Sequence, residues 1–316
     1  MSYNKNDRQK IRHLLYVPFS GLGLYDGFRG NAWLRNRIVV FKQFVIPSLL
    51  AQSTKDFVLW CSWRSQEKTN PLVKELIEYL DAIPDFKTVH TFHGVCFWDD
   101  KYRDEIARDR LLMSLHGSLA ELTDVVGDVD EVLMTIQPSD DLYSRDSFKM
   151  IRKTLENPGI QAVGFKHGYV MDYKNKTVAE WNPATNPPFF TIKFPRAIFL
   201  DPLKHFDYTG PYKSHEYVGD KLKYVQLEVR GFMVGTHFDN ISTVFDHPYT
   251  GKRVMPHIQK EFGIFMAPYL RLDLSRRRVL FSKLPYRAKR KLRYLAGEKK
   301  WLLRPLFNLV YNWLRG

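Results

Sequence analysis

The chain has 316 residues, which is enough to bury a sizeable core in one large domain or in two smaller ones. Its hydrophobic content of 44% and aromatic content of 15% are those of a folded globular protein, and no run of about 18 apolar residues is present, which excludes a membrane-spanning helix of ordinary length. The net charge of +14 is concentrated at one end: residues 271–316 contain 14 Lys/Arg against 2 Asp/Glu, a net of +12 that leaves only +2 for residues 1–270.

Neither cysteine has the spacing of a metal site, and both Cys61 and Cys96 fall in apolar runs of strand type. We therefore expect buried thiols in a reducing compartment. The apolar run at 14–19 is too short for the core of a signal peptide followed by a cleavage site, so no export is expected.

The predicted elements alternate between strands and helices along most of the chain. In order they are a strand at 13–19, a glycine-rich loop at 21–30, a helix at 33–52, a strand at 57–63, a helix at 71–82, a strand at 88–97, a helix at 102–122, a strand at 131–136, a helix at 146–156 that begins with a good cap, and a strand at 161–172. Pro47 is expected to bend or end the first helix, and Pro71 occupies the favoured first position of the second. This alternation predicts an α/β fold with a mainly parallel, doubly wound sheet. After residue 182 the pattern loosens into aromatic segments containing proline, which we expect to form a substrate-facing half rather than another sheet layer.

Two adjacent carboxylates, Asp140 and Asp141, follow the predicted strand 131–136 directly. Their mutual repulsion favours a shared cation, and the carboxyl end of a buried strand is where open α/β sheets bind ligands. Hard anionic oxygens suit Mg²⁺ or Mn²⁺, which in turn suit a diphosphate. Taken alone, the same residues also fit a solvated turn, because Pro, Ser and Asp all favour turns.

Other polar residues extend this hypothesis. Arg108 and Arg110 lie on the predicted helix that leads toward this strand, and the planar fork of arginine suits phosphate oxygens, although a solvated helix face would look the same. His237 follows an apolar stretch and is a candidate third ligand of a Mn²⁺ site. Glu216 and Asp220 lie near a predicted helix start, where a carboxylate can take a proton from an attacking hydroxyl or can simply favour the helix dipole.

At these residues the chain resembles a family. The helical segment 107–110 and Ser139-Asp140-Asp141 after a strand are similar to conserved elements of GT-A glycosyltransferases. The blocks at 33–52, 139–141 and 236–240 resemble, more narrowly, a bacterial family of rhamnosyltransferases, in patches across residues 13 to 245. The resemblance implies a GT-A-like, Rossmann-like fold for residues 1–270, with a donor half at about 1–145 and an acceptor half at about 146–270.

The resemblance also implies roles for single residues. A nucleotide-sugar diphosphate would be bound through Mn²⁺ or Mg²⁺ held by Asp140, with Asp141 beside it and His237 closing the site. The remaining donor-binding positions would be Phe19 at the nucleobase, Ser139, and Arg108 or Arg110. Pro138 stands where the family's motif has its first acid, and Pro18-Phe19-Ser20 replaces its usual Arg-Phe-Asn, so the way the ribose is held and the donor nucleotide are expected to differ. An inverting enzyme would need Glu216 or Asp220 as its base, whereas a retaining enzyme would not.

The basic segment 271–316 ends in an amphipathic pattern with two tryptophans. Such a helix suits an anionic membrane surface, at about 1 kcal/mol per surface cation. Together with this tail, the resemblance implies a hexosyl- or deoxyhexosyltransferase, peripheral on the inner face of the cell membrane, that acts on a glycan or lipid-linked acceptor in cell-surface polysaccharide synthesis. A final helix packed on the domain is the alternative for the tail, and nucleic acid is an unlikely partner because no recognisable nucleic-acid module is present. The alternative for the whole chain is a non-catalytic membrane- or nucleic-acid-binding protein on a degenerate transferase fold. A third function, that of a nucleotidyltransferase, would need a glycine- and lysine-rich phosphate loop, which the sequence lacks.

Overall fold

The computed structural model of the chain describes residues 10–20, 30–94, 104–209, 215, 218–237, 245, 249–254, 257–265 and 272, with the backbone alone for 104–108. The predicted basic tail, apart from Leu272, and Cys96 lie outside these ranges. Cys61 is buried, as expected. Across the ranges that the structure describes, no helix combines the length and the apolar character needed to cross a membrane.

Four parallel strands form one half of the sheet. They are β1 (Ile11–Pro18), β2 (Val58–Arg64), β3 (Thr88–Gly94) and β4 (Glu131–Ile136), in the order β3-β2-β1-β4. β1, β2 and β4 are buried along most of their length because helices cover both faces, as is usual for parallel strands. All four strands therefore end at the same edge of the sheet, where the polar residues after β4 also lie.

The other half of the sheet is largely antiparallel. β8 (Phe190–Pro195) lies between β4 and β6 (Ala162–Asp172), followed outward by β7 (Thr177–Trp181) and β10 (Thr250–Val254). The long strand β9 (Tyr224–Thr236) pairs parallel with β6 and antiparallel with the short β5 (Leu142–Tyr143). The segment after residue 182 adds strands to this same sheet, with β8 inserted beside β4 and β9 beside β6, and it builds no second sheet layer among the described residues. Its role as a substrate-facing half stays a prediction. The predicted fold class is confirmed as an α/β sheet flanked by helices, consistent with a GT-A-like, Rossmann-like fold.

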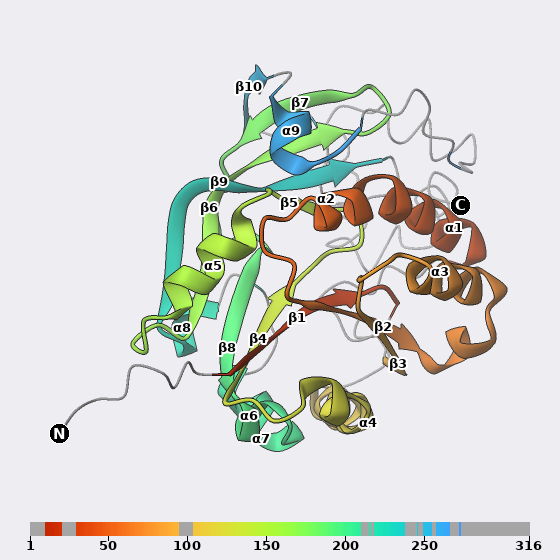
Figure 1. Cartoon of the computed structure of the whole chain (residues 1–316), viewed down its shortest axis with the longest axis vertical. Coiled ribbons are helices and arrows are strands. Elements are labelled where there is room, and N and C mark those ends of the chain that lie inside the picture. Colours follow the sequence, from red (N-terminus) through yellow and green to blue (C-terminus); the bar gives the residue numbers. More distant parts are fainter. Residues whose placement is uncertain are drawn as a thin grey trace, which may run out of the picture.

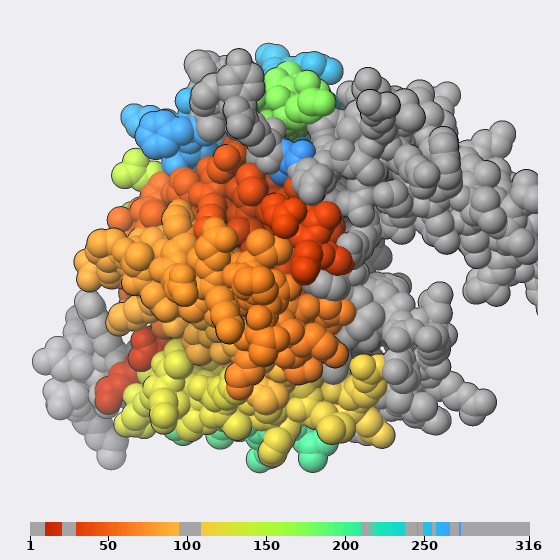
Figure 2. All heavy atoms as spheres, turned by 90° about the vertical axis from the view of Figure 1, so that its right-hand side faces the viewer, coloured from red at the N-terminus to blue at the C-terminus, as the bar shows by residue number. Residues whose placement is uncertain are grey.

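The helices divide into two layers, one on each face of the sheet (Figure 1). One layer contains α1 (Asn31–Val40), α2 (Ile46–Leu50), α3 (Pro71–Asp81) and α5 (Ser147–Leu155), and the other contains α4 (Asp104–Val126), α6 (Arg196–Phe199) and α7 (Pro202–Thr209). Neighbouring residues of β1 point into different layers: Leu15 and Val17 belong to the first core, and Leu14 and Tyr16 to the second. In the space-filling view, the segment from α1 to β3 (red to orange) covers the upper and middle parts of one face and α4 (yellow) the lower part (Figure 2). The structure also describes the short helices η2 (Ser65–Thr69), α8 (Val218–Lys221) and α9 (Ile258–Phe262).

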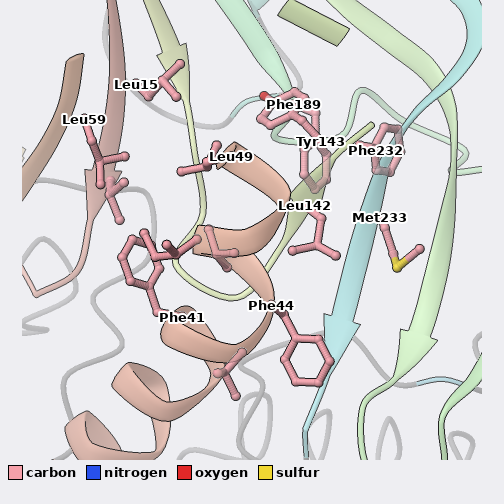
Figure 3. Packing of buried hydrophobic residues seen from close by; sticks show 14 of the residues in the cluster. Leu15, Phe41, Phe44, Leu49, Leu59, Leu142, Tyr143, Phe189, Phe232 and Met233 are labelled. Carbon is pink, nitrogen blue, oxygen red and sulfur yellow. The ribbon is translucent and has the colours of Figure 1, made fainter. Parts of the chain in front are cut away.

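The predicted helix at 33–52 is continuous, but it contains a π-helical turn, η1 (Phe41–Val45), between α1 and α2. Pro47 follows this turn closely. Because proline has no N–H and its ring crowds the carbonyl four residues earlier, a widened turn lets the helix pass the proline without ending. Phe44 lies on the side of β9, whereas Phe41 lies on the side of Leu59 of β2 (Figure 3) and packs on Phe19 at the end of β1. Ser48 of α2 donates its hydroxyl proton to the Tyr143 carbonyl of β5 at 2.9 Å. These contacts fix the first helix against the sheet, and so fix where the polar side chains of α1 lie.

Two predicted helix starts differ in how they are capped. The side chain of Asn70 accepts a hydrogen bond from Leu72 N at 3.0 Å, so α3 has a polar N-cap. Asp146, predicted to cap the next helix, makes no such bond. Instead Ser147, the first residue of α5, donates its Oγ proton to the Gly231 carbonyl at 2.7 Å. The start of α5 is therefore anchored to β9.

Candidate functional site

The turn after β4 is held by the side chain of Gln137. Its backbone N–H donates to the Tyr16 carbonyl at 2.8 Å, which continues the pairing of β4 with β1. Its Nε2 donates to the carbonyls of Pro138 and Asp141, both at 2.9 Å. A buried amide that spans the turn in this way fixes the backbone that carries Asp140.

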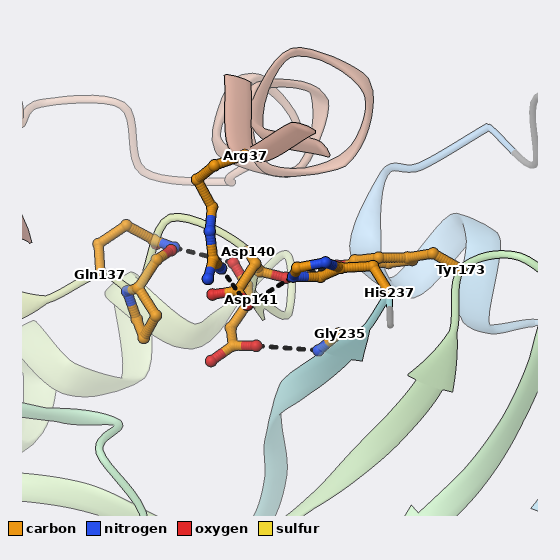
Figure 4. A network of polar contacts seen from close by, with 8 residues as sticks. Arg37, Gln137, Asp140, Asp141, Tyr173, Gly235 and His237 are labelled. Carbon is orange, nitrogen blue, oxygen red and sulfur yellow. Dashed lines mark hydrogen bonds and ion pairs between the residues drawn. The ribbon is translucent and has the colours of Figure 1, made fainter. Parts of the chain in front are cut away.

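Asp140 lies at the centre of three elements that are far apart in the sequence. Its Oδ2 forms an ion pair with the Arg37 guanidinium from α1, and it lies 3.0 Å from Nε2 of His237, the residue after β9 (Figure 4). The side chains of Arg37 and His237 are 5% and 1% exposed, and that of Asp140 is 13% exposed, so the contact is largely withdrawn from water. The sequence-based expectation that Asp140 and His237 share a site agrees with this geometry.

The two adjacent carboxylates have opposite electrostatic surroundings. Burial alone would raise the pKa of Asp140, but the charge of Arg37 and the contact with His237 outweigh burial and lower the pKa to about 2. Burial and the neighbouring charge of Asp140 together raise the pKa of Asp141 well above its usual range. Asp140 is therefore the carboxylate that keeps its charge.

Asp141 points toward a different partner. Its Oδ1 accepts a hydrogen bond from Gly235 N at 2.9 Å, on the side away from Arg37 (Figure 4). Asp141 thus connects the turn to β9, and its carboxylate does not share the contact between Asp140 and His237. Its predicted place beside the cation stays a prediction.

Tyr173 and Gly235 pack against the backbone of Asp140. Tyr173 donates its hydroxyl proton to the Asp140 carbonyl at 2.7 Å, and its ring stacks on Phe44 of η1 with centroids 4.0 Å apart. Gly235 lies so close that a Cβ there would be 2.2 Å from Tyr173 Cε2 and 2.4 Å from the Asp140 carbonyl oxygen. Only glycine fits this position, so the end of β9 approaches the Asp140 turn as closely as the backbone allows.

The donor set suits a hard divalent cation with few protein ligands. The described residues contain no group of three or more His, Cys, Asp or Glu side chains arranged to hold a metal ion. Mg²⁺ and similar ions commonly take only one or two protein ligands and complete their shell with substrate phosphates and water. The separation of 3.0 Å between Asp140 Oδ2 and His237 Nε2 is close to that of two adjacent ligands on an octahedral ion, roughly 3 Å for bonds of about 2.1 Å. The pair therefore fits such an ion, with Arg37 as a competing partner for the same oxygen.

Two other predicted donor residues are buried. Phe19 is 1% exposed, and its ring lies between Trp63, stacked at 4.5 Å, and Phe41 at 4.8 Å. Its ring is part of the core at the end of β1, which leaves no open face for the predicted contact with a nucleobase. Ser139 is 8% exposed, within the turn that Gln137 holds.

The remaining predicted residues lie apart from Asp140 or outside the described ranges. Arg110 is half-buried on α4, in the layer on the opposite face of the sheet from α1, and the side chain of Arg108 lies outside the described residues. Glu216 also lies outside them. Asp220 is exposed on α8, which precedes β9, whereas His237 follows that 13-residue strand. The length of β9 thus separates Asp220 from the site, and the structure does not bring the two together.

Sequence reasoning missed Arg37 and Tyr173 as site residues. Arg37 carried a usable signal, because it is a charged residue between Leu34 and Ile38 on an apolar helix face, where a buried charge needs a partner. Tyr173 carried none, since its role depends on the close approach of Gly235 from another strand.

Comparison with known proteins gives a distant likeness. No protein-family model matches the chain, and neither does any curated protein. Among solved structures, the chain is similar to the crystal structure of residues 1–349 of TarS from S. aureus, with 14% sequence identity and a TM-score of 0.39. The match covers 72% of this chain and 61% of that one, so the chain spans less than two thirds of the structure it resembles. A likeness this distant carries no information about activity, and the function must be argued from the site.

Proposed function

We propose that this protein is a glycosyltransferase that moves a sugar from a nucleotide-diphosphate sugar to a hydroxyl of a glycan or lipid-linked acceptor. The observation that carries the proposal is the ionised Asp140, in contact with both His237 and Arg37 at the carboxyl end of β4. Open α/β sheets bind ligands at this edge. This cluster combines a carboxylate with an imidazole and a guanidinium that both contact it. Such a cluster suits a diphosphate and its cation better than it suits a neutral ligand.

In this proposal Asp140 and His237 hold Mn²⁺ or Mg²⁺. The ion, when bound, stabilises the negative charge that develops on the leaving diphosphate. Asp140 supplies an oxygen that stays ionised at neutral pH, because Arg37 and His237 lower its pKa to about 2. Gln137 and Tyr173 orient Asp140 by fixing its backbone on both sides. Holding the charged groups in place beforehand is what makes such electrostatic stabilisation effective.

The acceptor side of the proposal depends on residues away from this turn. Glu216 stays our candidate for the base that takes the acceptor's proton in an inverting reaction. Arg108, whose side chain lies outside the described residues, stays a candidate for a donor contact. Three further points complete the proposal: a hexose or deoxyhexose as the sugar of the donor, a role in cell-surface polysaccharide synthesis, and attachment to the inner face of the membrane through the basic segment 271–316.

Nucleotide binding tests the proposal without knowledge of the sugar or the acceptor. UDP, GDP, CDP and dTDP, each with Mn²⁺, should be screened by thermal shift against the full chain. A ligand at 100 times its Kd stabilises the folded state by about 2.7 kcal/mol, which a melting curve resolves easily. At least one of the four should raise the melting temperature, whereas a non-catalytic protein on the same fold would respond to none.

Asp140→Asn provides the matched variant, because it removes the charge and keeps the volume. Asp146→Asn, at an exposed acid six residues further along the chain, is the control. The nucleotide-dependent shift and donor hydrolysis should be lost in the first variant and kept in the second. An Asp140→Asn protein that binds and hydrolyses the donor as the wild type does would refute the role of this site.

A further inference from the structure

Within the part of the chain that the structure describes, Arg37 and His237 both contact the same oxygen of Asp140. Arg37 contacts Oδ2 from α1, and His237 Nε2 lies 3.0 Å from the same atom from the end of β9. In Figure 4 the guanidinium of Arg37 lies on one side of the Asp140 carboxylate and the imidazole of His237 lies on another. If His237 and Asp140 are ligands of a cation, Arg37 occupies part of the space around the oxygen that the cation would use.

The guanidinium of Arg37 is held in place, but not all of its N–H groups donate a hydrogen bond within the described part of the chain. Its Cζ lies 5.2 Å from the centre of the Trp33 ring, in a cation–π arrangement that holds the side chain against α1. Its Nε is buried and has no hydrogen-bond partner in the part of the chain that the structure describes. A guanidinium has five N–H donors in a planar fork, so Arg37 has donors left for a second anion besides Asp140.

Charge balance decides what can enter this site. Arg37 and Asp140 together are neutral, and both are largely buried. A divalent cation arriving alone would place two further positive charges beside a buried guanidinium, where repulsion is strong because water is scarce. A diphosphate that arrives with the cation brings at least two negative charges, which restore the balance and give the free donors of Arg37 an acceptor.

We infer that Arg37 makes cation binding at Asp140 depend on the diphosphate. In the ligand-free protein, the guanidinium of Arg37 offsets the charge of Asp140. The divalent ion binds weakly alone and tightly together with the diphosphate, whose oxygens accept hydrogen bonds from the Arg37 fork. This inference rests on the proposed function for the identity of the diphosphate, but its first test needs the metal ion alone.

The first test measures Mn²⁺ binding without nucleotide, from the electron paramagnetic resonance signal of free Mn²⁺. Arg37→Gln should bind Mn²⁺ more tightly than the wild type, by about 5- to 150-fold, the usual range of coupling between two sites. Arg37→Lys keeps the charge and should stay close to the wild type. Arg35→Gln, at an exposed arginine on the same helix, is the matched control and should bind Mn²⁺ as the wild type does. Arg37→Gln binding Mn²⁺ no more tightly than the wild type, or binding none, would overturn the inference.

The second test uses the wild type alone, and so does not depend on the folding of any variant. Mn²⁺ together with the stabilising nucleoside diphosphate should raise the melting temperature by more than the sum of the two separate shifts. Additive shifts would overturn the inference while leaving the proposed function intact. If none of the four nucleotides stabilises the protein, the proposed function fails, and Mn²⁺ binding to Arg37→Gln still decides the role of Arg37.

Discussion

Gly235→Ala should damage the site and the stability of the protein together. The new Cβ would lie 2.2 Å from Tyr173 Cε2 and 2.4 Å from the Asp140 carbonyl oxygen, far inside contact distance. Neither neighbour can move freely, because the Tyr173 ring is stacked on Phe44 and its hydroxyl is bonded to that same carbonyl. Overpacking of this kind costs about 1–3 kcal/mol, and each hydrogen bond that breaks adds about 1 kcal/mol. The bonds at risk are Gly235 N to Asp141 and Tyr173 to Asp140.

Thermal unfolding and nucleotide-dependent thermal shift, measured on the same samples, test this prediction. Each kcal/mol lowers the melting temperature by about 2–4 °C for a domain of this size class, and displacement of Asp140 should remove the shift caused by Mn²⁺ with a nucleoside diphosphate. Gly219→Ala is the control, because a Cβ there meets its nearest neighbour at 3.5 Å, an ordinary contact. That variant should be neutral or more stable by about 0.4–1 kcal/mol. A Gly235→Ala protein with the melting temperature and the nucleotide response of the wild type would refute the argument from close approach.

Two further predictions concern buried polar groups. Burial lowers the pKa of His13 to about 3, with help from the charge of Arg152, and that of His205 to about 4, whereas both titrate near 6.5 when unfolded. Below about pH 6.5 the unfolded state therefore binds more protons than the folded state, and the free energy of unfolding should drop by about 1.4 kcal/mol per pH unit for each histidine. Urea unfolding at pH 7, 6 and 5 measures this free energy. The same value at all three pH values would contradict the prediction. Gln52→Leu should cost about 1–3 kcal/mol, because Gln52 Nε2 donates to two carbonyls in the β5 region, at 3.2 and 2.9 Å. The exposed Gln66→Leu is its control, and equal unfolding free energies for the two variants would show that this buried amide is not needed.

The parallel half of the sheet could be predicted because its signals are local. The strand at 131–136 lies at the predicted residues, and each strand–helix unit of this half was recognisable from its own apolar pattern. β8 was not predicted as a strand of the sheet, because prolines at 187, 188 and 195 surround it. Its position also depends on a partner far away in the sequence, as the contact between Thr135 and Thr191 shows, 56 residues apart. Local patterns do not say which strands become neighbours.

The candidate site could be predicted in part for the same reason. Asp140 follows a buried strand and His237 follows an apolar run, so each was visible alone, and the fold places them 3.0 Å apart. In the sequence, Asp220 was as good a candidate for the catalytic base as Glu216, but the whole length of β9 separates it from His237. The resemblance assigned Phe19, at the end of the first predicted strand, to the nucleobase, yet its aromatic neighbours enclose it. These outcomes depend on three-dimensional neighbours that a single sequence does not reveal.

The most direct test of the account is to locate the cation. Crystals of the protein with Mn²⁺ and the nucleoside diphosphate that stabilises it should be measured for the anomalous scattering of manganese. We predict one strong peak within bonding distance of both Asp140 and His237, with the diphosphate on its open side and Arg37 donating to a phosphate oxygen. A nucleotide bound with the manganese peak elsewhere, or with Arg37 still paired to Asp140 and no metal between Asp140 and His237, would contradict the account.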